Sequence, residues 1–247
     1  MKCLILAAGY ATRLYPLTEN FPKPLLKVRG KNILDWLLDD IDSTCAVDGY
    51  AVVTNHKFAP AFTDWACGHR LPIRVLDDGT ESNETRLGAV RDMQFAIDAL
   101  SLQDDLLVIA GDNLLDFSLA DYLAYQREKG TSCVMRYYEA DEKKLRRAGV
   151  AEVDENDRII GMEEKPAEPK SNWCTPPFYI LKASDVGLVK AAIESGCGVD
   201  APGSFIVWLS TKTAVHAWPM PGRRYDIGTL ESYDAVQREY RGIRPKG

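Results

Sequence analysis

The first half of the chain alternates between short apolar runs and amphipathic segments, and this alternation restricts the fold more than any other feature. Apolar runs typical of buried strands occupy residues 3–8, 50–53, 73–76 and 106–110. Segments with apolar residues at helical spacing occupy residues 33–41, 58–66 and 87–100. A strand and a helix repeat every roughly 25–30 residues, which predicts an α/β fold with a Rossmann-like, mixed but mostly parallel sheet flanked by helices.

The second half of the chain has a different pattern, with few long helices. Strands are predicted at residues 132–138, 149–154, 158–163 and 177–181, where they extend or flank the main sheet. The sequence DEND at residues 154–157 is typical of a hairpin turn. A last helix is expected at residues 231–240. Because no proline-rich linker, low-complexity tract or repeat interrupts the chain, a single domain over residues 1–247 is expected.

Composition excludes several classes of partner. The net charge of −6 and the pI of about 5.2 argue against a nucleic-acid partner, which selects for a basic face. No apolar run approaches the ~20 residues that a membrane span needs, and no signal peptide is visible, so neither membrane insertion nor export is expected. The six cysteines contain no C-x-x-C pair, which favours free thiols in a reducing cytoplasm.

Polar segments follow three of the predicted strands, at residues 9–13, 77–86 and 111–113. Ligands of parallel sheets bind beyond the carboxyl ends of the strands, so these segments are the candidate site. Small side chains around Gly9 would let backbone amides approach an anion, and Arg13 offers a planar fork for phosphate oxygens. Lys23 lies between two prolines and would add a fixed positive charge. On these residues alone, a plain packing turn remains the alternative.

Several motifs occur together and in a fixed order along almost the whole chain. They are LAAGYATRL at 6–14, YPLT at 15–18, PKPLL at 22–26, GDN at 111–113, GV at 149–150, EEKP at 163–166, PKSN at 169–172 and YDIGT at 225–229. In this set and order the chain resembles the sugar-phosphate nucleotidyltransferases, such as glucose-1-phosphate thymidylyl- and uridylyltransferases. One departure is Ala11, where the family usually has glycine. Because alanine adopts a positive φ less easily, a small change of loop conformation is expected there.

The resemblance implies a fold, a reaction and a set of site residues. The fold would be that of nucleotide-diphospho-sugar transferases, with a part of about residues 1–115 for an NTP and a part of about 116–230 for a phosphorylated small-molecule acceptor. The implied catalytic residues are Arg13, Lys23 and Asp112, and the implied Mg²⁺ ligands are Asp112 and Asp226. The implied nucleotide-binding residues are Leu6, Ala7, Ala8, Gly9, Thr12, Arg13, Asp78, Arg86, Gly88 and Gly111. The implied acceptor-binding residues are Gly149, Glu164, Lys165, Asn172 and Tyr179.

The chemistry explains these residue types. When a phosphate oxygen attacks an α-phosphorus, two anionic groups come together, and a hard cation held by carboxylates disperses their charge. The attacking phosphate is already a nucleophile, so no general base is expected. The resemblance implies a cytoplasmic role in nucleotide-sugar biosynthesis, as a supplier of precursors for cell-surface polysaccharide. Homo-oligomers are common in this fold, and no C-terminal β-helix domain is expected.

The substrate stays open between several alternatives. The loop at residues 77–86 is longer and more acidic than in thymidylyltransferases, which leaves the base undetermined between CTP, UTP and dTTP. Pro177 replaces a glycine common among the sugar enzymes and offers no N–H to a sugar. Trp173, Trp208, Trp218 and Tyr179 are possible pocket residues and would suit a quaternary ammonium if several of them converged. A CTP-dependent cytidylyltransferase acting on phosphocholine or another non-sugar phosphate is therefore the second hypothesis. A non-catalytic nucleotide-sensing subunit is the third.

Overall fold

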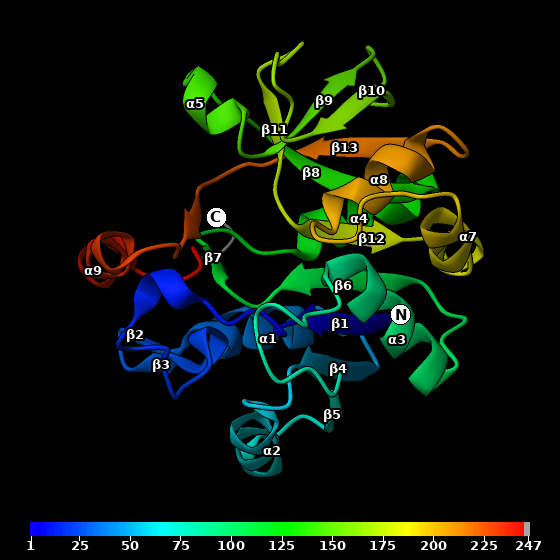
Figure 1. Cartoon of the computed structure of the whole chain (residues 1–247). Helices are drawn as coiled ribbons and strands as arrows, with labels where there is room; N and C mark the ends of the chain where they lie inside the picture. The colour runs from blue at the N-terminus through cyan, green and yellow to red at the C-terminus, as the bar shows by residue number, and fades with distance from the viewer. Residues whose placement is uncertain (245–247) are drawn as a thin grey trace. The chain divides into compact units, whose positions relative to one another are not determined.

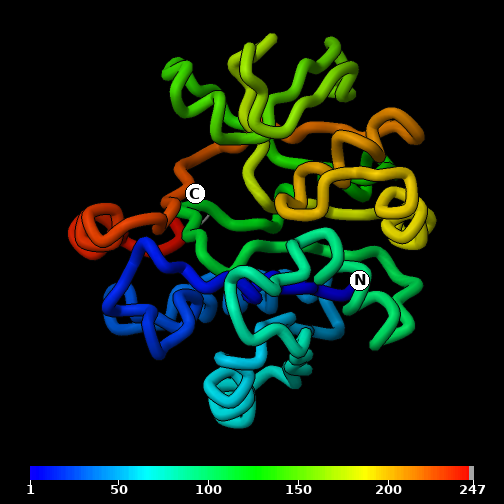
Figure 2. Tube along the Cα trace, in the orientation of Figure 1, coloured from blue at the N-terminus to red at the C-terminus, as the bar shows by residue number. Residues whose placement is uncertain are grey.

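The structure is a computed structural model that describes residues 1–244. The chain forms two compact units. Unit 1 comprises Met1–Arg86, Ala110–Asp121 and the chain from Pro221 onward, and unit 2 comprises Leu87–Ile109 and Tyr122–Met220. The tube in Figure 2 traces the chain as it passes between the two units more than once. Each unit is therefore built from segments that are distant in the sequence.

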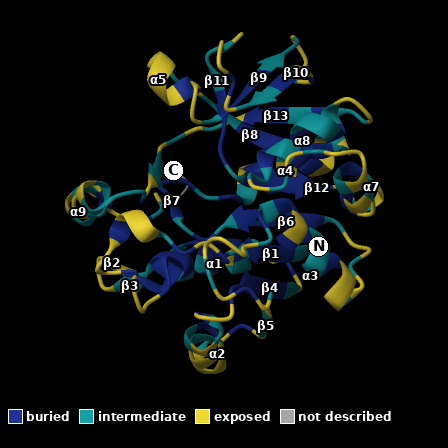
Figure 3. Cartoon of the chain, in the orientation of Figure 1, coloured by how far each residue is buried: buried dark blue, intermediate teal, exposed yellow. Residues whose placement is uncertain are grey.

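Unit 1 contains a parallel arrangement of three strands, β1 (Lys2–Leu6), β4 (Gly49–Thr54) and β5 (Ile73–Asp77), which lie side by side in Figure 1. Lys2 lies opposite Gly49, and Tyr50 lies opposite Ile73. The connections between them contain α1 (Ile33–Ser43) and α2 (Ala59–Gly68). β1 and β4 are buried along most of their length (Figure 3), as their uninterrupted apolar sequences require. Their carboxyl ends deliver the polar segments of the candidate site.

The rest of unit 1 packs around a second group of apolar residues. The short strands β7 (Asn113–Leu115) and β14 (Arg224–Asp226) pair antiparallel, and β2 (Lys27–Val28) pairs with β3 (Lys31–Asn32). Helix α9 (Leu230–Glu239) begins at a capping box in which Thr229 accepts from the Ser232 amide. The buried cluster consists of Leu14, Leu26, Val28, Ile33, Leu114, Ile227, Val236 and Tyr240. This cluster fixes the start of the chain against its end.

Unit 2 contains a mixed set of strands. β12 (Phe178–Leu181) pairs antiparallel with β6 (Leu106–Ala110) and with β8 (Ser132–Tyr138), whereas β13 (Val215–Pro219) pairs parallel to β8. β9 (Gly149–Val153) pairs antiparallel with β10 (Ile159–Glu164) and with β11 (Trp173–Thr175). The helices of this unit are α3 (Ala89–Leu100), α4 (Ala120–Lys129, which starts in unit 1), α5 (Glu142–Leu145), α6 (Ala183–Val186), α7 (Leu188–Glu194) and α8 (Gly203–Ser210).

The predicted class is confirmed, because helices flank strands that are parallel in unit 1 and mixed in unit 2. The hairpin turn at residues 154–157 is confirmed as well: the Asp154 amide donates to the Arg158 carbonyl, and Asp157 has φ 64°. Helix α3 starts two residues later than its apolar spacing suggested. The pattern did not predict β7, β13 and β14, whose sequences are short or interrupted by polar residues.

Two further expectations concern the surroundings of the chain. All six cysteines are free thiols, as expected from their spacing. None of the helices within residues 1–244 combines the length and the hydropathy that a bilayer crossing requires.

Candidate functional site

The turn after β1 is held firmly except at Gly9. The Ala7 amide donates to the Val53 carbonyl at 2.9 Å, and Asn55 Nδ2 donates to the Ala8 carbonyl at 3.0 Å. Both alanines are buried, whereas Gly9 is exposed. A side chain placed on Gly9 would meet nothing within 4 Å. The turn therefore presents open space in front of a fixed backbone, which is what an anion-binding turn needs.

Ala11 adopts the conformation that glycine favours. It has φ 48° and ψ 40°, in the left-handed region, so the expectation that alanine would avoid a positive φ here was wrong. Two hydrogen bonds hold it, because the Ala11 carbonyl accepts from Thr18 Oγ1 at 2.8 Å and from the Leu14 amide at 3.0 Å. The surrounding contacts therefore impose a backbone conformation that is costly for a residue with a β-carbon.

A short 3₁₀ turn, Thr12–Leu14, follows and presents the two polar side chains of the predicted loop. Leu14 is buried in the apolar cluster, while Thr12 and Arg13 are exposed. Arg13 Nη2 lies 3.9 Å from the point that a β-carbon on Gly228 would occupy. The guanidinium is thus next to the segment that follows Asp226, and its contact with a phosphate stays a prediction.

Lys23 and Asp112 form the most strongly defined ion pair of the site. Lys23 Nζ lies 2.7 Å from Asp112 Oδ2, and the lysine side chain is only 8% exposed whereas that of Asp112 is 38% exposed. Lys23 begins the 3₁₀ turn Lys23–Leu25 after Pro22, which fixes its backbone. The ion pair holds the Lys23 ammonium in place beside a carboxylate that reaches solvent, so little side-chain entropy is left to lose when a ligand binds.

Gly111 brings Asp112 to this position. Its amide donates to the Leu6 carbonyl at 3.1 Å, so the turns after β1 and β6 are joined. A β-carbon on Gly111 would lie 3.1 Å from Pro24 Cγ and 3.2 Å from Ile5 Cγ2. Glycine is therefore needed for close packing at this point, and the same packing places Asp112 against Lys23.

The pairing of β7 with β14 brings Asp226 to the same place. Asp226 lies opposite Asn113, the residue after Asp112. Asn113 is buried, donates to Asp112 Oδ1 at 2.6 Å and accepts from Arg224 Nη1 at 2.5 Å. The Asp226 side chain is 57% exposed, with its Oδ2 3.9 Å from Arg224 Nη1. Both predicted metal carboxylates are thus on neighbouring positions and reach solvent.

This donor set fits Mg²⁺. No group of three or more His, Cys, Asp or Glu side chains that would hold a metal occurs within residues 1–244. Mg²⁺ takes oxygen ligands, keeps several waters and is commonly held by one or two carboxylates together with substrate phosphates. Asp112 and Asp226 supply those two carboxylates.

The acidic loop after β5 is ordered and tied to the phosphate turn. Asp78 Oδ1 accepts from both the amide and the hydroxyl of Thr80 at 2.7 Å, and Tyr10 Oη donates to the Thr80 carbonyl at 3.0 Å. A hydrogen bond between His56 Nδ1 and Asp77 Oδ2 raises the pKa of His56. Arg86 is exposed at the far end of the loop. Asp78 therefore lies close to the turn that it was predicted to serve, while Arg86 belongs to the loop's outer part.

Gly88 belongs to unit 2 and has a packing role. It has φ 90°, and a β-carbon there would lie 2.6 Å from the Val199 carbonyl oxygen. The amides of Ala89 and Val90 at the start of α3 donate to the carbonyls of Asp200 and Val199. Close backbone contact within unit 2 explains this glycine, and its predicted contact with the nucleotide stays a prediction.

Three of the five predicted acceptor residues meet in unit 2. A β-carbon on Gly149 would lie 3.1 Å from Glu164 Oε2, and one on Gly203 would lie 2.1 Å from that oxygen and 3.4 Å from Tyr179 Oη. Gly149, Tyr179 and Gly203 therefore lie around the Glu164 carboxylate, and Gly203 was not among the predicted site residues. Nothing in the local sequence of Gly203 marks it, since it reads as an ordinary helix start.

The other two acceptor candidates, Asn172 and Lys165, also lie in unit 2. Asn172 Nδ2 donates to the Glu139 carbonyl at 2.8 Å, and the Glu139 amide donates back to the Asn172 carbonyl at 2.9 Å. Lys165 is exposed, with φ 50°. Asn172 thus closes a loop, while Lys165 keeps its charge at the surface next to Glu164.

The sequence comparison decides the family. The nucleotidyl transferase family model matches residues 2–242 of the chain. The chain belongs to the nucleotidyl transferase family. This match covers the phosphate turn, both candidate metal carboxylates and the acceptor candidates.

The similar proteins are named as nucleotidyl transferases of sugar phosphates or as a pyrophosphorylase of UDP-glucose. The chain is 27% identical over 250 residues to a protein named as a mannose-1-phosphate guanyltransferase of Sulfolobus acidocaldarius, and it spans 65% of the length of that protein. Its fold is similar to that of a UDP-glucose pyrophosphorylase complexed with UDP-glucose (TM-score 0.78, 20% identity, 96% of each chain). It is also similar to a protein assigned as a glucose-1-phosphate thymidylyltransferase from Bacillus anthracis (TM-score 0.77, 21% identity, 99% of this chain and 98% of that one).

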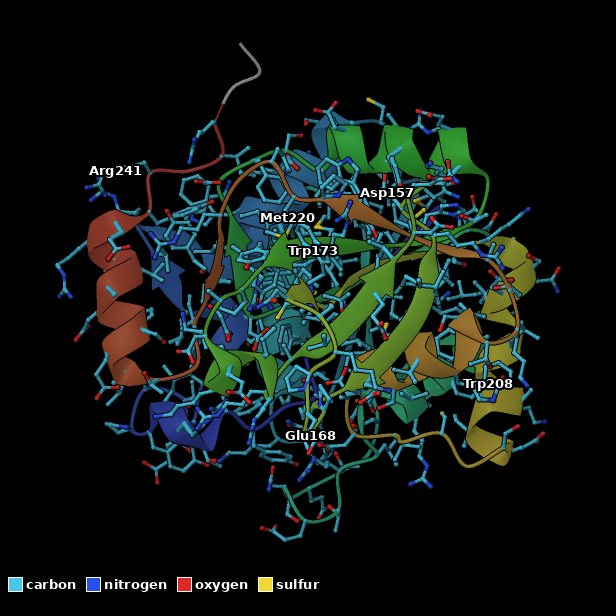
Figure 4. The ribbon with its side chains drawn as sticks, turned by 90° about the horizontal axis from the view of Figure 1, so that it is seen from above. Asp157, Glu168, Trp173, Trp208, Met220 and Arg241 are labelled. Atoms are coloured by element: carbon cyan, nitrogen blue, oxygen red, sulfur yellow. The ribbon has the colours of Figure 1, made fainter. Side chains whose placement is uncertain are left out.

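The tryptophans of this nucleotidyl transferase have separate packing roles. Trp173 packs edge-on against Tyr138 and under Arg136, whereas Trp208 stacks on Phe205. Trp218 stacks on Tyr122 with ring centroids 5.4 Å apart. Figure 4 shows Trp173 and Trp208 well apart within unit 2. Each of the three tryptophans therefore packs against a different aromatic ring.

Proposed function

We propose that this nucleotidyl transferase moves a nucleoside monophosphate from an NTP to a sugar 1-phosphate, with formation of an NDP-sugar and release of pyrophosphate. The observation that carries the proposal is the ion pair of Lys23 with Asp112, 2.7 Å long, beside an open phosphate turn. Family membership adds weight, and so do the relatives, which are named for transfer to mannose 1-phosphate or glucose 1-phosphate.

In the proposed reaction an oxygen of the acceptor phosphate attacks the α-phosphorus of the NTP. A new P–O bond forms, the bond from the α-phosphorus to the bridging oxygen breaks, and pyrophosphate leaves with that oxygen and its electron pair. No proton needs to leave the attacking phosphate. The residues therefore act by alignment and charge: Lys23 and Arg13 offset the negative charge that gathers on the phosphates.

Asp112 and Asp226 would hold Mg²⁺, which when bound supplies charge neutralisation on the triphosphate and the attacking phosphate. Asn113 keeps the Asp112 carboxylate oriented through its 2.6 Å hydrogen bond. Arg224 in turn holds the Asn113 amide from the partner strand. The two short strands thus position both carboxylates.

The acceptor side favours a sugar over phosphocholine. A trimethylammonium group is recognised by converging aromatic faces, and the three tryptophans pack separately. The residues around Gly149 in unit 2 instead include the Glu164 carboxylate, a strong acceptor for hydroxyl groups. The nucleobase is the point on which the named relatives differ, so it is a question for assay.

The proposal is tested by pyrophosphate release from ATP, CTP, GTP, UTP and dTTP in the presence of Mg²⁺. Each NTP is paired with glucose 1-phosphate, mannose 1-phosphate and phosphocholine. Turnover is expected with a sugar 1-phosphate and should disappear on chelation of the metal. Turnover with phosphocholine alone, or with none of the acceptors, refutes the proposal.

Two variants connect the activity to the ion pair. Lys23→Met and Asp112→Asn should each lower kcat at least about 100-fold, because they remove charge directed at the reacting phosphates. Asp234→Asn, on the exposed face of α9, is the matched control and should keep the wild-type kcat. An active Asp112→Asn enzyme would remove Asp112 from the mechanism.

A further inference from the structure

Three residues form a row across the strands β10, β9 and β11 of unit 2. Glu164 lies opposite Gly149, and Thr175 lies opposite Gly149 from the other side. Residues directly opposite one another in neighbouring strands share a face of the sheet. The carboxylate and the hydroxyl therefore flank a position that has no side chain.

The two oxygens converge on the same point. A β-carbon on Gly149 would lie 2.5 Å from Thr175 Oγ1, 3.1 Å from Glu164 Oε2 and 3.2 Å from Met162 Cε. The third of the nearest atoms is the flexible end of a methionine, which adapts readily to a ligand. We call this arrangement, the two oxygens with the backbone of Gly149 between them, the notch.

Thr175 Oγ1 lacks a partner in this notch. Thr175 is 6% exposed, and its hydroxyl is buried without a hydrogen bond to any of residues 1–244. A buried unpaired hydroxyl destabilises a protein, and valine has the same shape without that cost. A threonine at this position is explained if a bound molecule completes its hydrogen bond.

We propose that Thr175 is a specificity residue that recognises a hydroxyl group of the acceptor, in partnership with Glu164. The acceptor hydroxyl donates to the Glu164 carboxylate and accepts from the Thr175 hydroxyl. This inference rests on the proposed function, because it assigns the notch to the acceptor. It selects a polyhydroxylated phosphate over phosphocholine, whose trimethylammonium group has no O–H or N–H to donate to Glu164.

The test is a binding measurement, which is independent of turnover. Glucose 1-phosphate, mannose 1-phosphate and phosphocholine are titrated calorimetrically into the wild type and Thr175→Val in the presence of a non-hydrolysable NTP analogue. Thr175→Val should raise the Kd of the sugar phosphate about tenfold. It should leave the Kd of phosphocholine unchanged and the Tm equal to or above that of the wild type.

Thr213→Val is the matched control. Thr213 Oγ1 is the hydroxyl of another threonine of unit 2 that is buried without a hydrogen-bond partner among the described residues. This control should match the wild type in sugar-phosphate affinity. Thr175→Ser keeps the hydroxyl and should restore most of the affinity, which separates the hydrogen bond from a packing effect.

Several outcomes overturn the inference. These are an unchanged Kd in Thr175→Val, an equal loss in Thr213→Val, an equal loss in Thr175→Ser, or the absence of sugar-phosphate binding to the wild type. Thr175-dependent binding without pyrophosphate release would instead support the notch and refute the proposed function. The two failures are therefore distinguishable.

Discussion

Replacement of Ala11 by glycine should stabilise this protein, although glycine usually destabilises. Ala11 has φ 48° and ψ 40°. An L-residue with a β-carbon in the left-handed region costs about 1–2 kcal/mol relative to an allowed conformation. Glycine does not incur this cost, but its larger freedom in the unfolded chain returns about 0.4–1 kcal/mol. The Ala11 methyl is partly buried against the apolar cluster of unit 1, and its loss subtracts a few tenths of a kcal/mol.

The net gain for Ala11→Gly is about 0.5 kcal/mol from these terms. For a chain of this size, that corresponds to a rise in Tm of roughly 1–2 °C. The hydrogen bonds of Thr18 and Leu14 to the Ala11 carbonyl involve only the backbone at position 11, so they persist in the variant. The native loop should therefore be kept while its strain is relieved.

The assay is thermal unfolding followed by circular dichroism, with urea unfolding as a check. Ala124→Gly is the matched control, because Ala124 is an exposed residue inside α4. It should lose about 1 kcal/mol, the usual cost of glycine in a helix. Ala11→Val should lose stability too, since a β-branched residue is disfavoured at positive φ.

The result that would refute the reasoning is a Tm of Ala11→Gly below that of the wild type while Ala124→Gly behaves as expected. In that case the left-handed conformation of Ala11 would not be strained, and the methyl contact would outweigh it. A gain in Ala11→Val would be equally contradictory. The same substitution, alanine to glycine, should raise the Tm at position 11 and lower it at position 124, so each variant serves as the reference for the other.

Two further predictions concern the Glu164 carboxylate. Burial raises the pKa of Glu164, with Lys165 opposing, so the folded protein binds this proton more readily than the unfolded chain. The free energy of unfolding of Glu164→Gln should therefore exceed that of the wild type by the full amount at pH 8, and this difference should shrink as the pH falls toward the ordinary glutamate pKa of 4.5. Urea unfolding of both proteins at pH 8 and pH 5 measures the difference. A difference that does not change with pH contradicts the prediction. A β-carbon on Gly203 would lie 2.1 Å from Glu164 Oε2, so Gly203→Ala should displace the carboxylate and raise the acceptor KM several-fold. Gly187→Ala, with nothing within 4 Å of the added carbon, should keep the wild-type KM, and equal KM values in both variants would argue against the displacement.

The sequence predicted best where the periodicity of apolar residues was strong. The strands β1 and β4 are mostly buried runs of apolar residues, and the helix α1 buries apolar residues at helical spacing, so local pattern was sufficient. The left-handed Ala11 was missed because propensity favours the common conformation. Contacts from Thr18 and Leu14 override that preference.

The metal carboxylates show where local pattern was insufficient. Asp226 ends the three-residue strand β14, and Asp112 directly precedes the three-residue strand β7; no periodicity indicates that these two strands pair. Their association was expected only from the family resemblance. Asn172 is a different case. Its motif suggested a contact with a ligand, whereas its side-chain amide donates to the Glu139 carbonyl.

The row across β10, β9 and β11 could not be predicted from sequence, because it depends on the register of three strands. Thr175 and Glu164 are eleven positions apart, and neither has a signal that points to the other. Once the register is known, Gly149 is the residue that permits the arrangement, since a side chain there would lie 2.5 Å from Thr175 Oγ1. Substitution at positions 164 and 175 could therefore change the acceptor while Gly149 stays. In the proposed mechanism Lys23 and Asp112, which lie in unit 1, would contribute charge whatever the acceptor, so the proposed chemistry and the proposed choice of acceptor rest on separate sets of residues.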